Sequence, residues 1–352
     1  MRSPRDFFLP LAIGAPEPPR VIPPLASRMI HFFDPSNARM VGKLPALAPT
    51  VDVLLGNLED AVEIDNKEAA RAGLVEVALT VDLGTTSLWA RVNALDSPWI
   101  LDDLTDLVLQ AGEQIDVLML PKIQGPEDIH YVDRLVAQLE ARAGLSRPIL
   151  LHAILETARG VANVEEICLA SPRLQGVSLG PADLAADREM KTTNVGGGHP
   201  GYLVRADAVN GEYDAPRVTA QQDLWHYTVA RMVDACRLAG IQPYYGPFGD
   251  ITDVLACEDQ FRNAYVMGCV GAWTLHPKQI EVARTVFTPD PDQVAWARRV
   301  VEALVDGAGA VMIDGKMQDD ASYKQCQKIL AFADLVAARD GTSRDGAAGS
   351  EG

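Results

Sequence analysis

Two acidic residues stand just after short apolar runs of this chain and carry its clearest chemical signal. Glu156 follows the run 149–155, and Asp183 comes shortly after the run 174–180. Runs of this length, each followed by helical sequence, are typical of buried parallel strands. If the two strands are neighbours, both acids emerge at the carboxyl edge of one sheet, where α/β folds keep their active sites. Two carboxylates with room for water and substrate suit Mg²⁺, with Mn²⁺ as an alternative.

Polar residues follow the other apolar runs in the same way. Arg91 and Lys122 end two of them, and with the two acids they suit the mouth of a site for a metal-bound oxyacid. The Arg91 guanidinium can stabilise the alkoxide or enolate that forms in carbonyl chemistry. Each residue taken singly also has a structural interpretation, such as a helix cap, an ion pair or a lysine at an apolar rim. The same holds for the strand-end residues Glu59, Asp60, Asp250 and His276.

The elements that would position these residues alternate regularly. Eight strand-like segments are separated by helical stretches over about 250 residues, which is the size of a (β/α)₈ barrel. An open doubly wound sheet is the alternative, but the first segment lacks the Gly-rich turn of a dinucleotide-binding version. Polar motifs at every strand end favour the barrel, so we predict an α/β fold of the TIM-barrel type. The segments are 28–33, 51–58, 87–93, 115–121, 149–155, 174–180, 241–246 and 270–275.

Composition shifts divide the chain into four predicted regions, one of which is the barrel. They are a Pro-rich extended arm (1–25), the catalytic barrel (26–289), a small C-terminal α-helical lid (290–339) and a disordered tail (340–352). Within the barrel, the connection 188–222 is much longer than the others and rich in Gly. Long ordered loops in compact domains are often lids or binding loops.

The overall composition narrows the class of partner. With a net charge of −17, the chain lacks the excess of Lys and Arg that nucleic-acid binding needs. No apolar run is long enough for a membrane span, and the N-terminus has no secretory pattern. The five Cys residues are scattered and have neither disulfide nor zinc spacing. We therefore expect a cytoplasmic protein with reduced thiols.

The order of the motifs resembles that of the citrate lyase β-subunit-like aldolases, and within them the malyl-CoA lyases. The likeness runs from about residue 8 to 340 and includes the bacterial type that also handles β-methylmalyl-CoA and citramalyl-CoA. The motifs that carry it are Asn57-Leu58-Glu59-Asp60-Ala61, Arg91-Val92-Asn93, Leu155-Glu156-Thr157-Ala158-Arg159-Gly160, Leu179-Gly180-Pro181-Ala182-Asp183-Leu184-Ala185, Gly196-Gly197-Gly198-His199-Pro200, Asp223-Leu224-Trp225-His226-Tyr227, Gly246-Pro247-Phe248-Gly249-Asp250 and His276-Pro277-Lys278-Gln279.

This resemblance implies roles for particular residues. Glu156 and Asp183 match the family's Mg²⁺ ligands, and Arg91 matches its substrate arginine. Asp319 matches the lid aspartate, an acid/base that acts at a neighbouring subunit's site in a homo-oligomer (a trimer or a hexamer). From the residues alone, Asp319 would be a helix N-cap. In the first βα loop, the CoA-binding positions of the family match Phe33, Arg39 and Lys43.

The implied reaction is reversible C–C cleavage of a 3-hydroxyacyl-CoA acid, with CoA thioesters and 2-oxo acids as substrates. Malyl-CoA would give acetyl-CoA and glyoxylate, and β-methylmalyl-CoA would give propionyl-CoA and glyoxylate. Three alternatives remain open: a citramalyl-CoA lyase that releases pyruvate, a malyl-CoA thioesterase on the same scaffold, and a non-catalytic CoA-binding subunit. A pocket discriminates one methyl group by only about 1–3 kcal/mol, so overlap among lyase substrates is expected.

Overall fold

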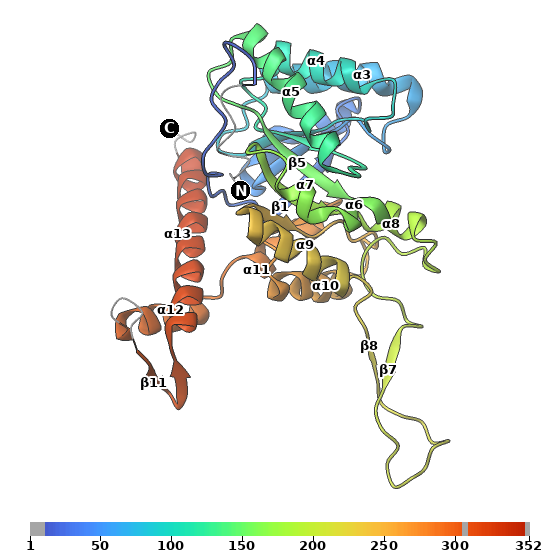
Figure 1. The fold of residues 1–352 in the computed structure, drawn as a ribbon, viewed down its shortest axis with the longest axis vertical. Coiled ribbons are helices and arrows are strands. Elements are labelled where there is room, and N and C mark those ends of the chain that lie inside the picture. Colours follow the sequence, from blue (N-terminus) through green and yellow to red (C-terminus); the bar gives the residue numbers. More distant parts are fainter. Residues whose placement is uncertain (1–10, 305–308, 349–352) are drawn as a thin grey trace.

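Eight parallel strands form one sheet in this computed structural model, which describes residues 11–304 and 309–348 (Figure 1). Their order in space is β10-β1-β2-β3-β4-β5-β6-β9, and each lies within one of the eight predicted segments. The predicted (β/α)₈ barrel is thereby confirmed. The strands are β1 (Met29–Phe33), β2 (Val53–Asn57), β3 (Ser87–Arg91), β4 (Val117–Leu120), β5 (Leu150–Leu155), β6 (Leu174–Leu179), β9 (Gln242–Tyr244) and β10 (Ala272–Thr274).

The sheet closes into a barrel between β9 and β10. Tyr245, directly after β9, forms an isolated parallel bridge with Ala272. Its main-chain nitrogen donates to the Gly271 carbonyl (2.9 Å), and its own carbonyl accepts from Trp273 (3.2 Å). Closure removes both exposed edges of the sheet, which is how a barrel avoids unpaired strands.

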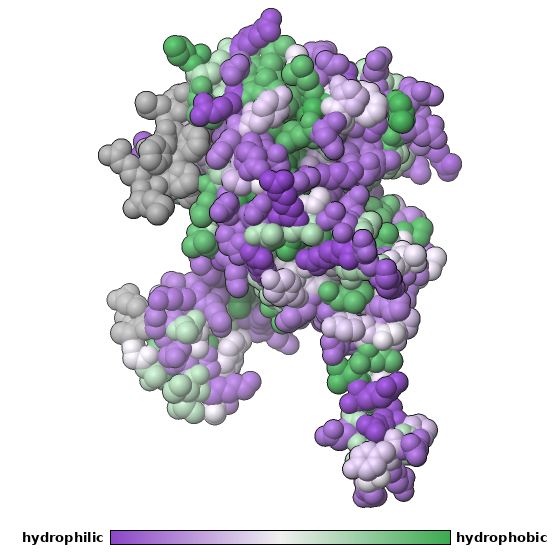
Figure 2. Space-filling model, turned by 45° about the vertical axis from the view of Figure 1, so that its right-hand side comes forward, coloured by the Kyte–Doolittle hydropathy of each residue, from purple (hydrophilic) through white to green (hydrophobic). Residues whose placement is uncertain are grey.

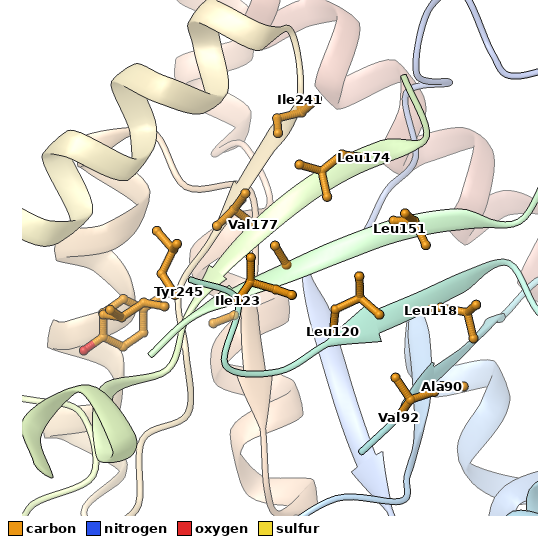
Figure 3. Close-up of a cluster of buried hydrophobic side chains, with 14 of the residues drawn as sticks. Ala90, Val92, Leu118, Leu120, Ile123, Leu151, Leu174, Val177, Ile241 and Tyr245 are labelled. Carbon is orange, nitrogen blue, oxygen red and sulfur yellow. The ribbon is translucent and has the colours of Figure 1, made fainter. Parts of the chain in front are cut away.

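Alternate residues of each strand face two separate cores. The inward residues fill the barrel interior with a small cluster that contains Trp89, Met119 and Ile154. The outward residues form the larger core beneath the helices, and Figure 3 shows part of it, including Leu118 and Leu151. Because both faces of every strand are covered, the strands read in the sequence as nearly continuous apolar runs.

Helices follow the strands and cover the outside of the barrel (Figure 1). Several begin at the expected signals: Asp253 caps α10, and Pro277 occupies the first position of α11. None of the helices in the described ranges is both long and apolar enough to cross a bilayer. The α-helices that precede the C-terminal element are α1 (Ala38–Val41), α2 (Leu44–Leu47), α3 (Lys67–Thr80), α4 (Ile100–Ala111), α5 (Pro126–Ala143), α6 (Ala158–Ala162), α7 (Val164–Cys168), α8 (Pro181–Asp187), α9 (His226–Ala239), α10 (Val254–Met267) and α11 (Pro277–Phe287).

The long connection 188–222 contains a β-hairpin that projects from the barrel (Figures 1 and 2). Its strands are β7 (Leu203–Arg205) and β8 (Thr219–Gln221), and all six of their residues are exposed. The sequence predicted only a long loop here. Short strands that are exposed on both faces leave no apolar alternation that could reveal them.

The C-terminal element consists of α12 (Pro291–Ala303), the hairpin of β11 (Val311–Ile313) and β12 (Lys316–Gln318), and α13 (Asp320–Ala348). Helix α13 continues past residue 339, so the structure has helix at 340–348 where the sequence analysis placed a disordered tail. A physical reason lies at the boundary, because Asp340 pairs with the buried Arg28 (2.7 Å). The remaining tail residues, 349–352, and positions 1–10 of the predicted arm lie outside the described residues.

Candidate active site

Strand alternation directs three charged side chains to the barrel mouth. In β3, Trp89 faces inward, so Arg91 two residues later does as well. In β5, Ile154 faces inward and Glu156 follows at the same spacing. Glu59 continues the inward register of β2, and all three residues are buried. The carboxyl ends of β2, β3 and β5 therefore present their charges to one space.

Glu156 is a buried carboxylate whose surroundings are built around it. Its Oε1 accepts from the Lys122 main-chain nitrogen (2.7 Å). A Cβ atom at Gly180 would come within 2.6 Å of Glu156 Oε2, so a glycine at this position leaves the room that the Glu156 side chain occupies. Burial raises the pKa of Glu156 to about 7; Asp183 and Glu59 add to the rise, and Arg91 opposes it. The second predicted metal ligand, Asp183, is therefore its electrostatic neighbour, and it is partly exposed.

Arg91 lies between two carboxylates and retains unused donor capacity. Its Nη2 is 2.5 Å from Glu59 Oε2 and 4.0 Å from Glu156 Oε2. The guanidinium also lies over the Trp273 ring, 5.8 Å from its centroid. Its Nε is buried and has no hydrogen-bond partner among the described residues. Since buried donors are rarely left unpaired, this nitrogen indicates a place for an oxygen of a ligand.

Lys122 connects the acids on the other side of the site. Its Nζ donates to Glu59 Oε1 (2.7 Å) and Asp60 Oδ2 (2.9 Å) and lies 3.9 Å from Asp183 Oδ1. Although burial opposes its charge, the hydrogen bonds to Glu59 and Asp60 raise the pKa of Lys122 above its ordinary value. The lysine is therefore a permanent cation at neutral pH.

The charges of this cluster do not balance. Four carboxylates (Glu59, Asp60, Glu156 and Asp183) meet two cations, so two negative charges remain when all are ionised. One divalent cation would neutralise that surplus, and carboxylate oxygens suit Mg²⁺. No group of three or more His, Cys, Asp or Glu residues within the described ranges forms a complete metal cage. A cation here would therefore also take ligands from water or substrate, which fits an open catalytic site.

The loop that carries Glu59 is fixed from behind by Lys67. The buried Nζ of this lysine donates to the carbonyls of Leu58 (2.7 Å) and Glu59 (3.0 Å) and to Asn93 Oδ1 (2.8 Å). Sequence reasoning did not find this contact. The sequence left open a helix cap for Glu59, and either a rim lysine or a place in the mouth for Lys122; in the structure the two form an ion pair in the site. The strand-end position was the available signal for both.

The predicted CoA-binding residues lie in different surroundings. Phe33 faces outward from β1 and is buried in the core beneath the helices. This burial does not fit the predicted CoA contact, and its cause is the alternation of β1, which turns the neighbouring Phe32 toward Trp273 (ring centroids 4.8 Å apart). Arg39 in α1 and Lys43 directly before α2 are both exposed in the connection between β1 and β2. The structure thus leaves the two basic residues accessible and encloses the aromatic one.

Asp319 lies away from the carboxylate cluster of its own chain. It caps α13, accepting from the main-chain nitrogens of Ala321 (3.1 Å) and Ser322 (3.2 Å). Farther along α13, Arg339 attaches the helix to the amino ends of the strands by pairing with Asp52 (2.9 Å). A helix of 20 residues is about 30 Å long, so Asp319 is far from that attachment. Figure 1 shows this end of α13 standing clear of the barrel.

The remaining strand-end residues have local structural roles. Asp250 is exposed and accepts from the main-chain nitrogen of Thr252 (2.9 Å). His276 caps α11 by accepting from Lys278. His276 follows the structural interpretation considered above, whereas Asp250 forms a turn with Thr252 and the cap of α10 is Asp253. The chemistry-bearing cluster is therefore confined to the ends of β2 to β6.

The fold and this cluster together define a barrel enzyme with its chemistry at the carboxyl ends of the strands. Residues 28–277 match the family described as HpcH/HpaI aldolase/citrate lyase. The chain belongs to this family, and it is an enzyme of the carbon–carbon lyase class. The family resemblance noted in the sequence is thus confirmed.

Two relatives extend this match over nearly the whole chain. A malyl-CoA/β-methylmalyl-CoA/citramalyl-CoA lyase of Chloroflexus aurantiacus is 56% identical over 95% of this chain and 96% of its own. An L-malyl-CoA/β-methylmalyl-CoA lyase of Cereibacter sphaeroides is 38% identical over 90% of this chain and 98% of its own. Among solved structures, protein CitE of Mycobacterium tuberculosis in complex with magnesium, acetoacetate and coenzyme A has a TM-score of 0.65. It is 24% identical, the match covers 88% of this chain and 98% of that one, and the similarity supports the fold.

Proposed function

We propose that this enzyme reversibly cleaves (S)-malyl-CoA to acetyl-CoA and glyoxylate, and β-methylmalyl-CoA to propionyl-CoA and glyoxylate. Citramalyl-CoA, which gives acetyl-CoA and pyruvate, is a further candidate substrate. The observation that carries the proposal is the 56% identity to a relative named for all three activities, over 95% of the chain. The mouth is independent support, because its surplus carboxylates can hold a divalent cation and Arg91 has an unpaired donor, and both would bind the oxygens of an anionic oxo acid.

In this proposal, Glu156 and Asp183 hold a divalent cation, Mg²⁺ or in its place Mn²⁺. When bound, the cation polarises the oxygens of the 2-oxo acid fragment. Arg91 directs its free Nε toward the oxygen on which charge develops. The bond between the hydroxyl-bearing carbon and the thioester's α-carbon breaks. The hydroxyl passes its proton to water as the carbonyl forms, and the α-carbon of the thioester enolate gains a proton from an acid, so no net proton is released.

We assign that second proton transfer to Asp319 of a neighbouring subunit. Support comes from the attachment of α13 to the amino ends of the strands, which holds Asp319 away from its own chain's carboxylates. A homo-oligomer, either a trimer or a hexamer, would bring this residue to an adjacent mouth. The C-terminal element would also exclude water, since a solvated enolate is rapidly protonated.

Arg39 and Lys43 remain our candidates for contacts with the CoA phosphates, because both are exposed in the connection between β1 and β2. Phe33 was predicted as the aromatic CoA contact, and it could serve only after leaving the core. We expect the protein to act in the cytoplasm, where its CoA thioester substrates occur.

The products decide between a lyase and a thioesterase. Purified protein is incubated with Mg²⁺ and malyl-CoA, glyoxylate is trapped as its hydrazone, and free thiol is followed in parallel. A lyase gives hydrazone at the rate of substrate loss without free thiol, whereas a thioesterase gives free CoA thiol and malate. Absence of both products would support the non-catalytic alternative. Exchanging malyl-CoA for citramalyl-CoA, with pyruvate measured, tests the third substrate.

Complementation tests the shared site. Asp319→Asn and Arg91→Ala are each expected to lower turnover strongly as separate assemblies. After subunit exchange, mixed assemblies contain some mouths with an intact Arg91 and a neighbour's intact Asp319, so part of the rate should return. No recovery after exchange verified by mass spectrometry would contradict a site shared between chains.

A further inference from the structure

Lys122 has an unusual main-chain conformation for a residue with a side chain. It follows β4 at the barrel mouth, and its φ is 54°, in the left-handed region. This region disfavours residues that have a Cβ, at a cost on the order of 1 kcal/mol or more. The other non-glycine residues with positive φ in the described ranges, Glu189, Asn210 and Asp314, lie outside the carboxylate cluster. Strain of this kind persists only where surrounding contacts maintain it.

The strained conformation lets one residue contact both sides of the site. The main-chain nitrogen donates to Glu156 Oε1 at 2.7 Å. The side chain extends the other way, where Nζ donates to Glu59 (2.7 Å) and Asp60 (2.9 Å). The same Nζ is 3.9 Å from Asp183 Oδ1. Lys122 thus donates hydrogen bonds to three of the four carboxylates of the cluster and lies 3.9 Å from the fourth.

Lys122 and Arg91 share one partner, Glu59. Glu59 uses Oε1 for the lysine and Oε2 for Arg91. Oε2 also accepts from the main-chain nitrogen of Asp60 (2.7 Å), which holds this oxygen in place. Without the ammonium, Oε1 would lose its charged partner and could turn toward the guanidinium, which already lies 2.5 Å from Oε2 and 4.0 Å from Glu156. The lysine therefore keeps Glu59 from binding the arginine through both oxygens and leaves the guanidinium close to Glu156.

The ammonium has a second consequence for any cation in the cluster. It supplies one of the two positive charges that oppose the four carboxylates, and it lies close to Asp183. Removing it would leave three uncompensated negative charges instead of two. A divalent cation would then bind more tightly, because the attraction between opposite charges at this range is large in a partly buried site.

We propose that Lys122 is a positioning residue that holds the Glu59–Arg91 pair in its productive arrangement and weakens cation binding at Glu156 and Asp183. Only the expected effect of Lys122 on turnover rests on the proposed lyase function. The expected effect on cation affinity depends on the charges of the cluster, so it can be measured whether or not the protein cleaves malyl-CoA.

The test compares Lys122→Met with wild-type protein and with Lys278→Met, which removes an exposed lysine after β10. Mg²⁺ binding to metal-free protein is measured by calorimetry, and malyl-CoA cleavage by hydrazone formation. For Lys122→Met we expect binding tighter by about tenfold and turnover lower by about 100-fold, with KM within about threefold of wild type. Lys278→Met should match wild type in both assays. A residue with only a structural role would not tighten Mg²⁺ binding.

Lys122→Arg keeps the charge and provides a second test if the methionine variant does not fold. We expect Mg²⁺ affinity within about twofold of wild type and partly restored turnover, because the guanidinium still neutralises Glu59. Unchanged or weaker Mg²⁺ binding in Lys122→Met would overturn the proposal. So would retained turnover in that variant, or a tenfold change of Mg²⁺ affinity in Lys122→Arg. Wild-type protein that cleaves malyl-CoA but binds no divalent cation would also overturn it.

Discussion

Charged side chains are buried at both ends of the barrel, and two clusters, one at each end, differ in their balance of charge. At the amino ends of the strands, Arg28 and Arg339 meet Asp52 and Asp340. Two cations face two carboxylates there, and Arg28 donates three hydrogen bonds to Asp52, one from its main-chain nitrogen (2.8 Å) and two from its guanidinium (2.8 and 2.9 Å). We call these four residues the floor cluster. At the carboxyl ends, the four carboxylates of the mouth form ion pairs with two cations, Arg91 and Lys122.

The difference separates stability from function. The charges of the floor cluster are paired: Arg28 and Asp52 are each about 2% exposed and form an ion pair with one another. Breaking a buried pair of this kind costs far more than losing an exposed one. The mouth instead retains surplus negative charge and an unpaired Arg91 nitrogen, and both lower the stability of the protein when no ligand is bound. We infer that the floor holds the fold together and that the mouth is arranged for ligands.

The largest expected effect follows from Glu156→Gln. Turnover should fall by about 10³-fold or more, because the variant loses a carboxylate that the proposed cation needs. The metal-free fold should not be weakened, since the substitution removes a buried charge whose pKa is raised. Hydrazone formation and thermal melting measure the two quantities, with the exposed Glu68→Gln as a control. Undiminished turnover would remove Glu156 from the site.

Asp52→Asn should have the opposite profile. It leaves the buried Arg28 facing a neutral group, so the free energy of unfolding should fall by about 3 kcal/mol. Mg²⁺ affinity should stay at the wild-type value, because the mouth is untouched. Chemical denaturation and calorimetry are the two measurements. A weakened Mg²⁺ affinity at unchanged stability would reverse the assignment of the two ends.

The barrel interior between the two ends allows a pH test. Burial lowers the pKa of His152 to about 3. The unfolded chain therefore takes up the proton first, and stability present above about pH 6.5 is lost as the pH falls toward 3. Between pH 6.5 and 4.5 this should amount to about 2 kcal/mol. His152→Gln should reduce the slope and the exposed control His130→Gln should keep it; equal slopes in denaturation curves would contradict the prediction.

The smallest effect is expected for Asp340→Asn. This partner of Arg28 is 45% exposed, and Arg28 keeps Asp52 when it is lost. The free energy of unfolding should therefore change by about 1 kcal/mol or less. A loss comparable to that of Asp52→Asn, measured as a shift of the urea midpoint, would show that α13 is held more strongly than its exposure indicates.

The barrel itself could be predicted from the sequence because buried parallel strands have a strong signal. The runs 149–155 and 174–180, for example, contain β5 and β6 almost residue for residue. The short hairpins were missed, since their strands have only three residues each. One local signal was present: Asp314 and Gly315 join β11 to β12 with φ of 50° and 75°, and Asp-Gly is a typical pair for such a turn.

The site was predictable in part for the same reason. Arg91 ends β3 and Glu156 directly follows β5, both in the inward register, so their strand-end positions could be read from the sequence, and the structure places them 4.0 Å apart. The link from Lys122 to Glu59 could not be read in this way, because it depends on a left-handed main-chain conformation in a loop. The burial of Phe33 follows from the register of β1, which the apolar run 28–33 did not reveal.

Attaching α13 to the floor has a kinetic consequence. If each mouth receives its acid from another chain, an isolated chain holds only part of the machinery, however well it folds. Specific activity should then decline on dilution below the concentration at which the chains dissociate. It should also recover when concentrated protein is restored, with a lag set by reassociation. Catalysis would in this sense be a property of the population of chains rather than of any single one.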